Sequence, residues 1–340
     1  PLPSPVAPPV TDAGQHIGIP TAGFSADTTL PASTPSTLGE AWAAATRRGA
    51  LTARDSKHVL ILFSGPYRRP DGLAVYLRQK GLKVTMFDND AEQGGADDDI
   101  TRDDVYNALM VRVRAGHFLA IFAAPPCSTF SVTRFFTSSD ATDGGPPPVR
   151  DRDHPEGLGD VPSAHRKELN RANLITRRTA ALLSAAYDAG SQIALEHPAD
   201  RGGRGTNSLF LDDRHCPLWL FPDVAQLIRH THSKLSTFAQ CMLGADHQKY
   251  TTIMYTAGFD DAFSHLEDLR CNHNEHTHQV GGSLDSEGKW RSSKSAAYPA
   301  DLNLLIANAI TALSLGELPH GAAAAPRLGA EHNDAFVDAG

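Results

Sequence analysis

The chain has 340 residues, 41% of them hydrophobic, so it can bury a large core in one α/β domain or two smaller ones. Its formal net charge of −8 excludes a protein held on nucleic acid by overall positive charge, so any DNA or RNA contact has to come from a local patch. Four scattered cysteines do not form a disulfide framework, and neither a run of about 18 apolar residues nor a signal peptide is present. We expect a soluble intracellular protein, nuclear or cytoplasmic, with no membrane partner.

Both ends of the chain lack the periodic apolar pattern of folded elements. Residues 1–50 are dense in Pro, Ala, Ser and Thr, and residues 318–340 include an alanine run. This composition buries too little apolar surface to offset chain entropy, so both segments are predicted to be mostly disordered. A Pro-rich start without Met further suggests a piece of a longer polyprotein. Residues 51–317 are predicted to form one catalytic domain.

Between the ends, short apolar runs alternate with helical patterns, which is typical of βαβ units around a parallel sheet. The expected strands are His58–Phe63, Lys83–Phe87, Phe118–Ala123, Gln192–Leu195 and Lys249–Tyr255. The expected helices are Gly72–Lys80, Asp103–Ala115, Ala164–Ala189 and Ala300–Leu313. Residues 132–162 contain Gly-Gly-Pro-Pro-Pro and mixed charge, so we predict a mobile loop insert there.

Chemically unusual residues follow the first two strands. Phe63, Ser64 and Gly65 end the first strand, and a glycine at that place either lets backbone amides approach a ligand or simply closes a turn. Asp88 follows the second strand, where a carboxylate can accept hydrogen bonds from a ribose or act as a cap. These residues are candidates for a ligand site at one edge of the sheet.

The third strand runs directly into Pro125, Pro126 and Cys127. Two prolines fix the backbone and remove two N–H donors, so the chain leaves the sheet in a stiff turn with Cys127 at its tip. Ligands of doubly wound sheets bind at the carboxyl ends of the strands, which is an unusual place for a structural thiol. We therefore interpret Cys127 as a nucleophile rather than a buried apolar side chain.

The run Ala-Pro-Pro-Cys-Ser-Thr-Phe-Ser at residues 124–131 resembles the Pro-Cys motif of cytosine-C5 DNA methyltransferases. Other segments within residues 57–313 are similar to further motifs of that family in the same order. They are Phe63–Gly65 for the first motif, Asp88 for the ribose-binding acid, Asp99-Ile100 for the adenine-contacting segment, Glu196 for Glu-Asn-Val, Gln248 for Gln-Arg-x-Arg and Tyr298 for the closing motif.

The resemblance implies a Rossmann-like class I S-adenosylmethionine-dependent methyltransferase sheet with flanking helices, acting on C5 of cytosine in DNA, or in RNA as a variant. In that chemistry the Cys127 thiolate adds to C6 of the ring, and Glu196 donates or shares a proton at N3. Gln248 is the third implied catalytic residue. The implied residues for binding S-adenosylmethionine are Phe63, Ser64, Gly65, Asp88, Asp99, Ile100, Pro125 and Tyr298.

The sequence departs from the family in several places. Tyr67 and Arg68 replace the second and third glycines of the first motif, and His197 follows Glu196 where the family has Asn. Residues 256–295 are too short for the usual target-recognition domain. The divergent pattern resembles a mobile-element or viral member of the family. A catalytically inactive methyltransferase-like module that binds nucleic acid or a partner within a larger protein is therefore an alternative.

A third interpretation is a methyltransferase that acts on an exocyclic amino group. Such an enzyme is expected to have Asp or Asn before Pro-Pro and an aromatic residue after it. Ala124 and Cys127 occupy those places and disfavour this reading.

Residues 256–295 also contain a cluster of potential metal ligands, namely Cys271, His273, His276 and His278. Cys and His at this spacing can bind structural zinc, with Cys241 or Cys216 joining from a distance. A second Cys-x-x-Cys half is absent, so a solvated polar loop is the other interpretation.

Basic residues are frequent after Cys127, with nearly as many acids between them. We interpret them either as a phosphate-binding track or as a salt-bridged helix face. They are Arg134, Arg150, Arg152, Arg166, Lys167, Arg171, Arg177 and Arg178.

Overall fold

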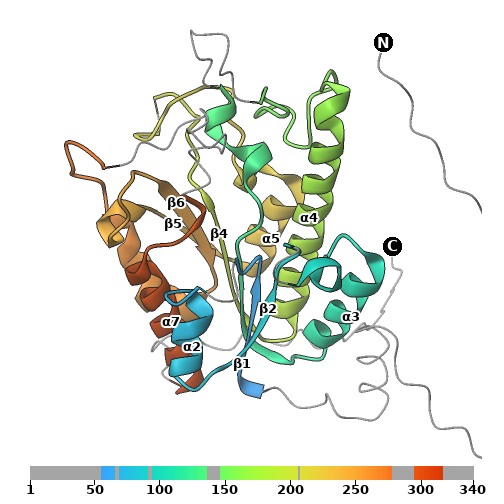
Figure 1. Cartoon of the computed structure of the whole chain (residues 1–340), viewed down its shortest axis with the longest axis vertical. Helices are drawn as coiled ribbons and strands as arrows, with labels where there is room; N and C mark the ends of the chain where they lie inside the picture. Colours follow the sequence, from blue (N-terminus) through green and yellow to red (C-terminus); the bar gives the residue numbers. More distant parts are fainter. Residues whose placement is uncertain are drawn as a thin grey trace, which may run out of the picture. The chain divides into compact units, whose positions relative to one another are not determined.

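The computed structural model describes residues 55–65, 69–90, 94–135, 146–205, 207–277 and 295–316. Within them, six strands form one sheet with helices on both faces (Figure 1). The strands are β1 (Asp55–Leu62), β2 (Lys83–Phe87), β3 (Phe118–Ala123), β4 (Gln192–Pro198), β5 (Lys234–Ala239) and β6 (Tyr250–Tyr255). The chain is therefore an α/β protein, as its alternating pattern predicted. The predicted disordered segments, 1–50 and 318–340, lie outside the described residues.

The strand order is β2-β1-β3-β4-β6-β5. Strands β1 to β4 are mutually parallel, with β1 between β2 and β3, so the chain reverses its winding direction at β1. Strand β6 is antiparallel to both β4 and β5, so the expectation of a parallel sheet is wrong at this strand. Only residues 240–249 connect β5 to β6, whereas parallel neighbours need a crossover of about a dozen residues or more.

Helices α2 (Leu73–Gln79) and α7 (Ala300–Ser314) lie on one side of the sheet in Figure 1. On the other side lie α3 (Asp103–Arg114), α4 (Ser163–Asp188) and α5 (Pro222–Thr231). A single-turn helix, α6 (Asp260–Phe263), follows β6. None of the helices in the described ranges combines the length and the hydropathy needed to span a bilayer.

Short 3-10 helices connect several of these elements. In the described part of the chain they are η1 (Gly95–Asp98), η2 (Ser128–Phe130), η3 (Val132–Phe135), η4 (Leu218–Leu220), η5 (Gln240–Leu243), η6 (Ala257–Phe259) and η7 (Ser264–Asp268). Four residues separate η2 from the end of β3, and η5 begins immediately after β5.

The core lies in two layers, one on each face of the sheet. Successive side chains of a strand point to opposite faces, so Leu60 and Leu62 pack with α3, α4 and α5, whereas Val59 and Ile61 pack with α2 and α7. Strand β3 is buried along its whole length, as expected for a central strand that is covered on both faces.

The predicted loop insert at residues 132–162 is partly packed, in a small apolar cluster of Val149, Val161 and Leu169 that is separate from these two layers. Residues 146–162 contain no helix or strand, as predicted. Val149 and Arg150 are nevertheless fully buried, at 0% and 1% exposure. This part of the segment is therefore a packed element of the fold, held by a buried arginine rather than by regular secondary structure.

Candidate active site

The carboxyl ends of β1 to β4 border a pocket of about 470 Å³. Because the chain reverses its winding direction at β1, this is the edge where open α/β sheets bind ligands. The volume is in the range of small-molecule sites. Its chemically distinctive lining residues are Phe63, Ser64, Gly65, Asp88, Pro125, Cys127, Glu196, Lys249 and Tyr298.

The end of β1 forms a strained turn beside the pocket. Phe63 has a positive φ of 61°, which is sparsely populated for a bulky residue and costs about 1–3 kcal/mol. The backbone amides of Phe63 and Ser64 both donate to Phe87 O, at 2.7 and 3.2 Å, and Gly65 N donates to Asp88 Oδ2 at 2.8 Å. These bonds hold the strained turn and place the Asp88 carboxylate at the pocket wall.

Cys127 lies half-buried at the tip of the turn that leaves β3. Burial raises the pKa of the Cys127 thiol, and the carboxylate of Glu196 raises it further, whereas the Lys249 ammonium lowers it. Phe130 N donates to Cys127 O at 3.0 Å, so η2 closes directly behind the thiol. Lys249 and Glu196 are therefore the two charged pocket residues that act on the thiol.

Glu196 is a buried carboxyl group on β4, 5% exposed, with its two oxygens in different surroundings. Tyr298 OH donates to Oε2 at 2.6 Å. Within the described part of the chain Oε1 has no hydrogen-bond partner, and Lys249 Nζ is 3.8 Å from it. A buried acceptor without a partner is costly, so Oε1 is available to a donor on a bound ligand.

Tyr298 comes from the segment that precedes α7. Burial raises the pKa of Tyr298 well above its usual value, and the neighbouring Glu196 carboxylate raises it further. The phenol is therefore a proton donor at neutral pH. Arg69, paired with Asp71 at 2.6 Å, also donates to Tyr298 O. Asn303 Nδ2 donates to Asp71 O at 2.9 Å, so two side chains tie this segment to the α2 side of the pocket.

Lys249 is a pocket residue that the sequence analysis did not single out. Its Nζ donates to Ser295 O at 3.2 Å and lies 5.9 Å from the centre of the Tyr298 ring. The preceding residue, Gln248, is exposed and does not line the pocket. A basic residue beside Gln248 was the available signal, and the structure brings Lys249, not Gln248, to Cys127 and Glu196.

The structure brings most of the predicted site together. Cys127 and Glu196 share the pocket with six of the predicted cofactor residues, Phe63, Ser64, Gly65, Asp88, Pro125 and Tyr298. Asp99 and Ile100 are not among its lining residues. The Asp99 carboxylate pairs with Arg171 at 2.9 Å, and Ile100 is buried in the core on the α3 and α4 face. The turn that carries these two residues leads into α3, on the opposite face of the sheet from α2 and α7.

Most of the basic residues that follow Cys127 form ion pairs or hydrogen bonds with other residues of this chain. Acidic partners neutralise five of them, namely Arg134, Arg152, Arg171, Arg177 and Arg178. Arg166 donates to the backbone oxygens of Gly159 and Val161. The salt-bridged interpretation is therefore favoured over a phosphate track.

Arg150 is a buried arginine whose role the sequence did not predict. Its guanidinium donates to Thr129 Oγ1 at 2.9 Å, Thr129 O at 3.2 Å, Asn173 Oδ1 at 3.0 Å and Pro155 O. It also lies 3.8 Å from the centre of the Phe130 ring. Burial lowers the pKa of Arg150 to about 10, so it stays charged at neutral pH. It locks η2, and hence the backbone behind Cys127, to the 146–156 segment.

The predicted metal ligands are partly brought together. Cys271, His273 and His276 lie close to one another and are joined by Cys241. Cys216 is buried elsewhere, beside Pro217. His278 lies outside the described residues.

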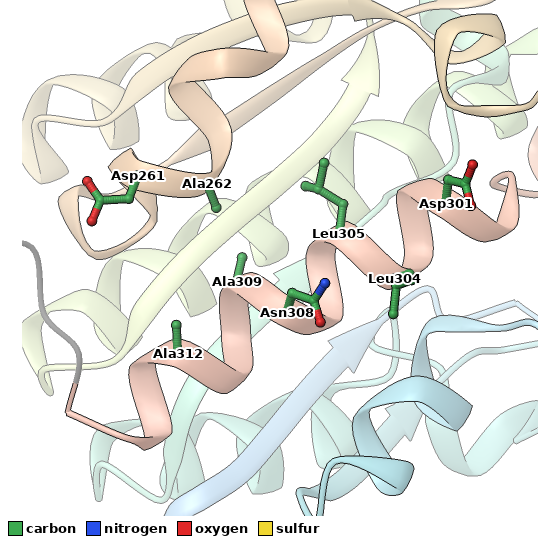
Figure 2. Close-up of a pocket in the computed structure, with 8 residues that line it drawn as sticks. All are labelled: Asp261, Ala262, Asp301, Leu304, Leu305, Asn308, Ala309 and Ala312. Carbon is green, nitrogen blue, oxygen red and sulfur yellow. The ribbon is translucent and has the colours of Figure 1, made fainter.

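A second pocket, of about 490 Å³, is an open groove along α7 and α6 (Figure 2). Figure 2 shows Asp261 and Asp301 near its two ends, with Leu304, Leu305 and Asn308 between them. Its volume is similar to that of the first pocket, so the side chains decide between the two. The groove has no nucleophile and no converging polar groups, so we take the pocket at the strand ends as the candidate site.

Fold and site together define an α/β protein that presents a thiol, a buried carboxyl group, an ammonium group and a phenol in one pocket at the strand ends. In comparisons with known proteins, no family model and no curated protein matches the chain. Function therefore has to be inferred from the chemistry of this pocket.

Proposed function

We propose that this chain is an S-adenosylmethionine-dependent methyltransferase that acts on C5 of cytosine in DNA. The observation that carries the proposal is the meeting of Cys127, from the end of β3, and Glu196, from β4, in one pocket. These are the residues that the resemblance assigns to attack at C6 and to protonation at N3. Cytosine in RNA has the same reactive ring and is the variant substrate.

The sheet supports a Rossmann-like class I methyltransferase fold as part of this proposal. Four parallel strands, a reversal of winding at β1 and a pocket outside the carboxyl ends are the features of nucleotide-binding α/β sheets. The antiparallel β6 does not oppose the assignment, because large α/β sheets are commonly mixed.

The pocket residues fit an adenosyl cofactor. Asp88 stands at the end of β2, where an acid binds ribose hydroxyls in dinucleotide folds. Its carboxylate is oriented by two backbone amides, from Gly65 at 2.8 Å and Asp90 at 3.0 Å, and each oxygen keeps a lone pair for a hydroxyl donor. Phe63 and Pro125 would supply apolar walls. When bound, the cofactor supplies an electrophilic methyl group.

The first step belongs to Cys127. Loss of its proton to water gives a thiolate that Lys249 stabilises by charge, and Sγ then forms a bond to C6 of cytosine. The electrons of the C5–C6 double bond move toward C5 as a proton is shared at N3, which makes C5 nucleophilic. Once C5 carries the methyl group, loss of the C5 proton to water would return those electrons to the C5–C6 bond, break the S–C6 bond and release the Cys127 thiolate.

Glu196 is positioned to contact N3 of the cytosine ring, which lies across the ring from C6. Tyr298 occupies Oε2 as a donor, which leaves Oε1 for the proton shared with N3. Lys249, 3.8 Å from Oε1, balances negative charge on either Glu196 or Cys127. In duplex DNA the base would have to leave the helix to reach this depth, at a cost of a few kcal/mol.

A catalytically inactive module that binds nucleic acid is the second candidate function. The raised pKa of the Cys127 thiol favours it, because burial keeps most of the thiol protonated at neutral pH. The two candidates share a fold and differ in whether a covalent bond forms. Trapping that bond therefore separates them.

The test is covalent trapping on 5-fluorocytosine. Fluorine at C5 cannot leave as a proton does, so the adduct persists and shifts the protein on a denaturing gel. With S-adenosylmethionine present, the full chain should form an adduct with fluorocytosine DNA or RNA. Cys127→Ser should abolish the adduct, and Cys216→Ala, the matched loss of a buried thiol outside the pocket, should retain it.

Two results would overturn the proposal. One is an adduct that persists in Cys127→Ser. The other is that neither DNA nor RNA gives an adduct or becomes methylated. If the folded wild-type chain still binds either nucleic acid, that result supports the inactive module instead.

A further inference from the structure

We infer that Cys241, Cys271, His273 and His276 form a structural zinc site. Their donor atoms all lie within 4.8 Å of one another. The inference concerns a different part of the fold from the pocket and does not rest on the proposed reaction.

The donor atoms have nearly the spacing of a tetrahedral metal site. Cys271 Sγ is 3.7 Å from His273 Nδ1 and 3.4 Å from His276 Nε2. Zinc–sulfur bonds of about 2.3 Å and zinc–nitrogen bonds of about 2.0 Å place neighbouring donors about 3.3–3.8 Å apart in a tetrahedron. Small side-chain rotations would therefore close the set around one ion.

The donor chemistry selects zinc. Two thiolates and two imidazoles form a Cys₂His₂ set, and a tetrahedral set of this kind favours zinc over the hard cations that need oxygen ligands. Two thiolates also balance the charge of Zn²⁺. This neutrality matters because Cys241 is 7% exposed, and an uncompensated charge there would be costly.

The backbone already holds the two ligand segments side by side. Cys241 lies in η5, directly after β5, and Ala239 N donates to Leu269 O at 2.9 Å, just before Cys271. Cys271 N donates to Tyr250 OH at 3.3 Å. Ligands from chain segments far apart in sequence are therefore brought together by the β5–β6 hairpin.

The site lies next to the element that provides Lys249. Gln240 N, adjacent to Cys241, donates to Lys249 O at 2.9 Å, while Lys249 Nζ reaches the pocket. A metal ion that ties Cys241 to the 271–276 segment would hold this hairpin connection in place. Zinc would therefore act as a structural staple at the Lys249 side of the pocket, without contact to a substrate.

Metal analysis of the full chain tests the inference. Protein purified by a route free of metal-affinity resin, from zinc-supplemented medium, should contain one zinc per chain. Cys241→Ser and Cys271→Ser should each lose most of it. Cys216→Ser is the matched thiol control and should keep it, as should His278→Gln, which separates this ligand set from one that uses His278.

Cobalt substitution provides a second, spectroscopic readout. Wild-type protein reconstituted with Co²⁺ should show the intense absorption of tetrahedral cobalt together with thiolate-to-cobalt charge transfer. Cys271→His keeps a ligand at that position and should retain the metal with weaker charge-transfer absorption. Three results would overturn the site. The metal-free wild type could take up neither ion, or its cobalt spectrum could be weak and octahedral. Zinc could also be lost in His278→Gln but kept in Cys241→Ser.

Discussion

Replacing Arg150 by methionine should destabilise the protein and disturb the backbone behind Cys127. Methionine has a similar length but no donors. The substitution would strand the acceptors on Thr129, Asn173 and Pro155, and it would remove the cation from the face of Phe130.

The magnitude follows from these contacts. Four stranded acceptors cost about 1 kcal/mol each at the lower end of the usual range, and the lost cation–π contact costs about 2 kcal/mol. Methionine also removes the penalty of burying a guanidinium, which is several kcal/mol. A net loss of about 2–4 kcal/mol in the free energy of unfolding remains.

Urea unfolding followed by circular dichroism measures this loss, with Arg177→Met as the matched control. Arg177 pairs with Glu156 at the surface, with side chains 47% and 50% exposed, so its replacement should cost about 0–1 kcal/mol. Under conditions where both variants are folded, only Arg150→Met should slow adduct formation by Cys127. Equal unfolding free energies for the two variants, or an unchanged rate of adduct formation in Arg150→Met, would refute this role.

Further predictions concern the pocket. Because burial raises the pKa of the Cys127 thiol above its usual 9.0, thiolate forms only at higher pH, and the alkylation rate measured by peptide mass spectrometry should keep rising beyond that pH. A plateau at lower pH contradicts this. Lys249→Met should slow the alkylation of Cys127, whereas Lys249→Arg should not. Equal alkylation rates in the two variants would exclude stabilisation of the thiolate by the charge of residue 249. Tyr298→Phe should cost about 1.5–3 kcal/mol in the free energy of thermal unfolding, and an unchanged stability would contradict a stabilising contact with Glu196. Glu196→Gln should slow adduct formation about 100-fold or more, and normal rates would remove Glu196 from the mechanism.

The strand ends were the part of the fold most readable from sequence. Lys83–Phe87 and Phe118–Ala123 have their predicted bounds, because a short apolar run between turn residues is a strong local signal. The end of such a strand fixes the position of the residues that directly follow it at the edge of the sheet. This is why Gly65, Asp88 and Cys127 could be assigned to one pocket before their contacts were known.

Elements at the far edge of the sheet could not be predicted in the same way. Strand β5 carries two exposed residues at its start and only a weak alternation, and α5, which precedes it, was not predicted either. The direction of β6 depends on the length of the connection from β5, so it could not be read without β5. Cys241 lies in η5, immediately after that unpredicted strand, and is brought near Cys271 by backbone pairing.

Gln248 and Lys249 show that a motif can locate a segment without determining which of two neighbouring side chains faces the pocket. Neighbouring side chains in extended backbone point to opposite sides. The resemblance located the pair next to β6, and the sheet geometry decides which member faces Cys127. Lys249 lines the pocket, while Gln248 is exposed outside it. A single-residue choice of this kind depends on tertiary packing.

The same alternation explains the departure at residue 197. Glu196 lies on the same face of β4 as Ala194, which packs with α2 and α7, so its carboxyl group enters the pocket. His197 points to the other face and lies edge-on to Phe130 and Trp219, with ring centres 5.2 and 6.2 Å away. Burial holds the pKa of His197 well below its usual value, so the ring is neutral and packs as an aromatic core residue. His197, which stands where the cytosine-C5 methyltransferases have asparagine, therefore packs in the core behind the Cys127 loop, while the carboxyl group of Glu196 lines the pocket.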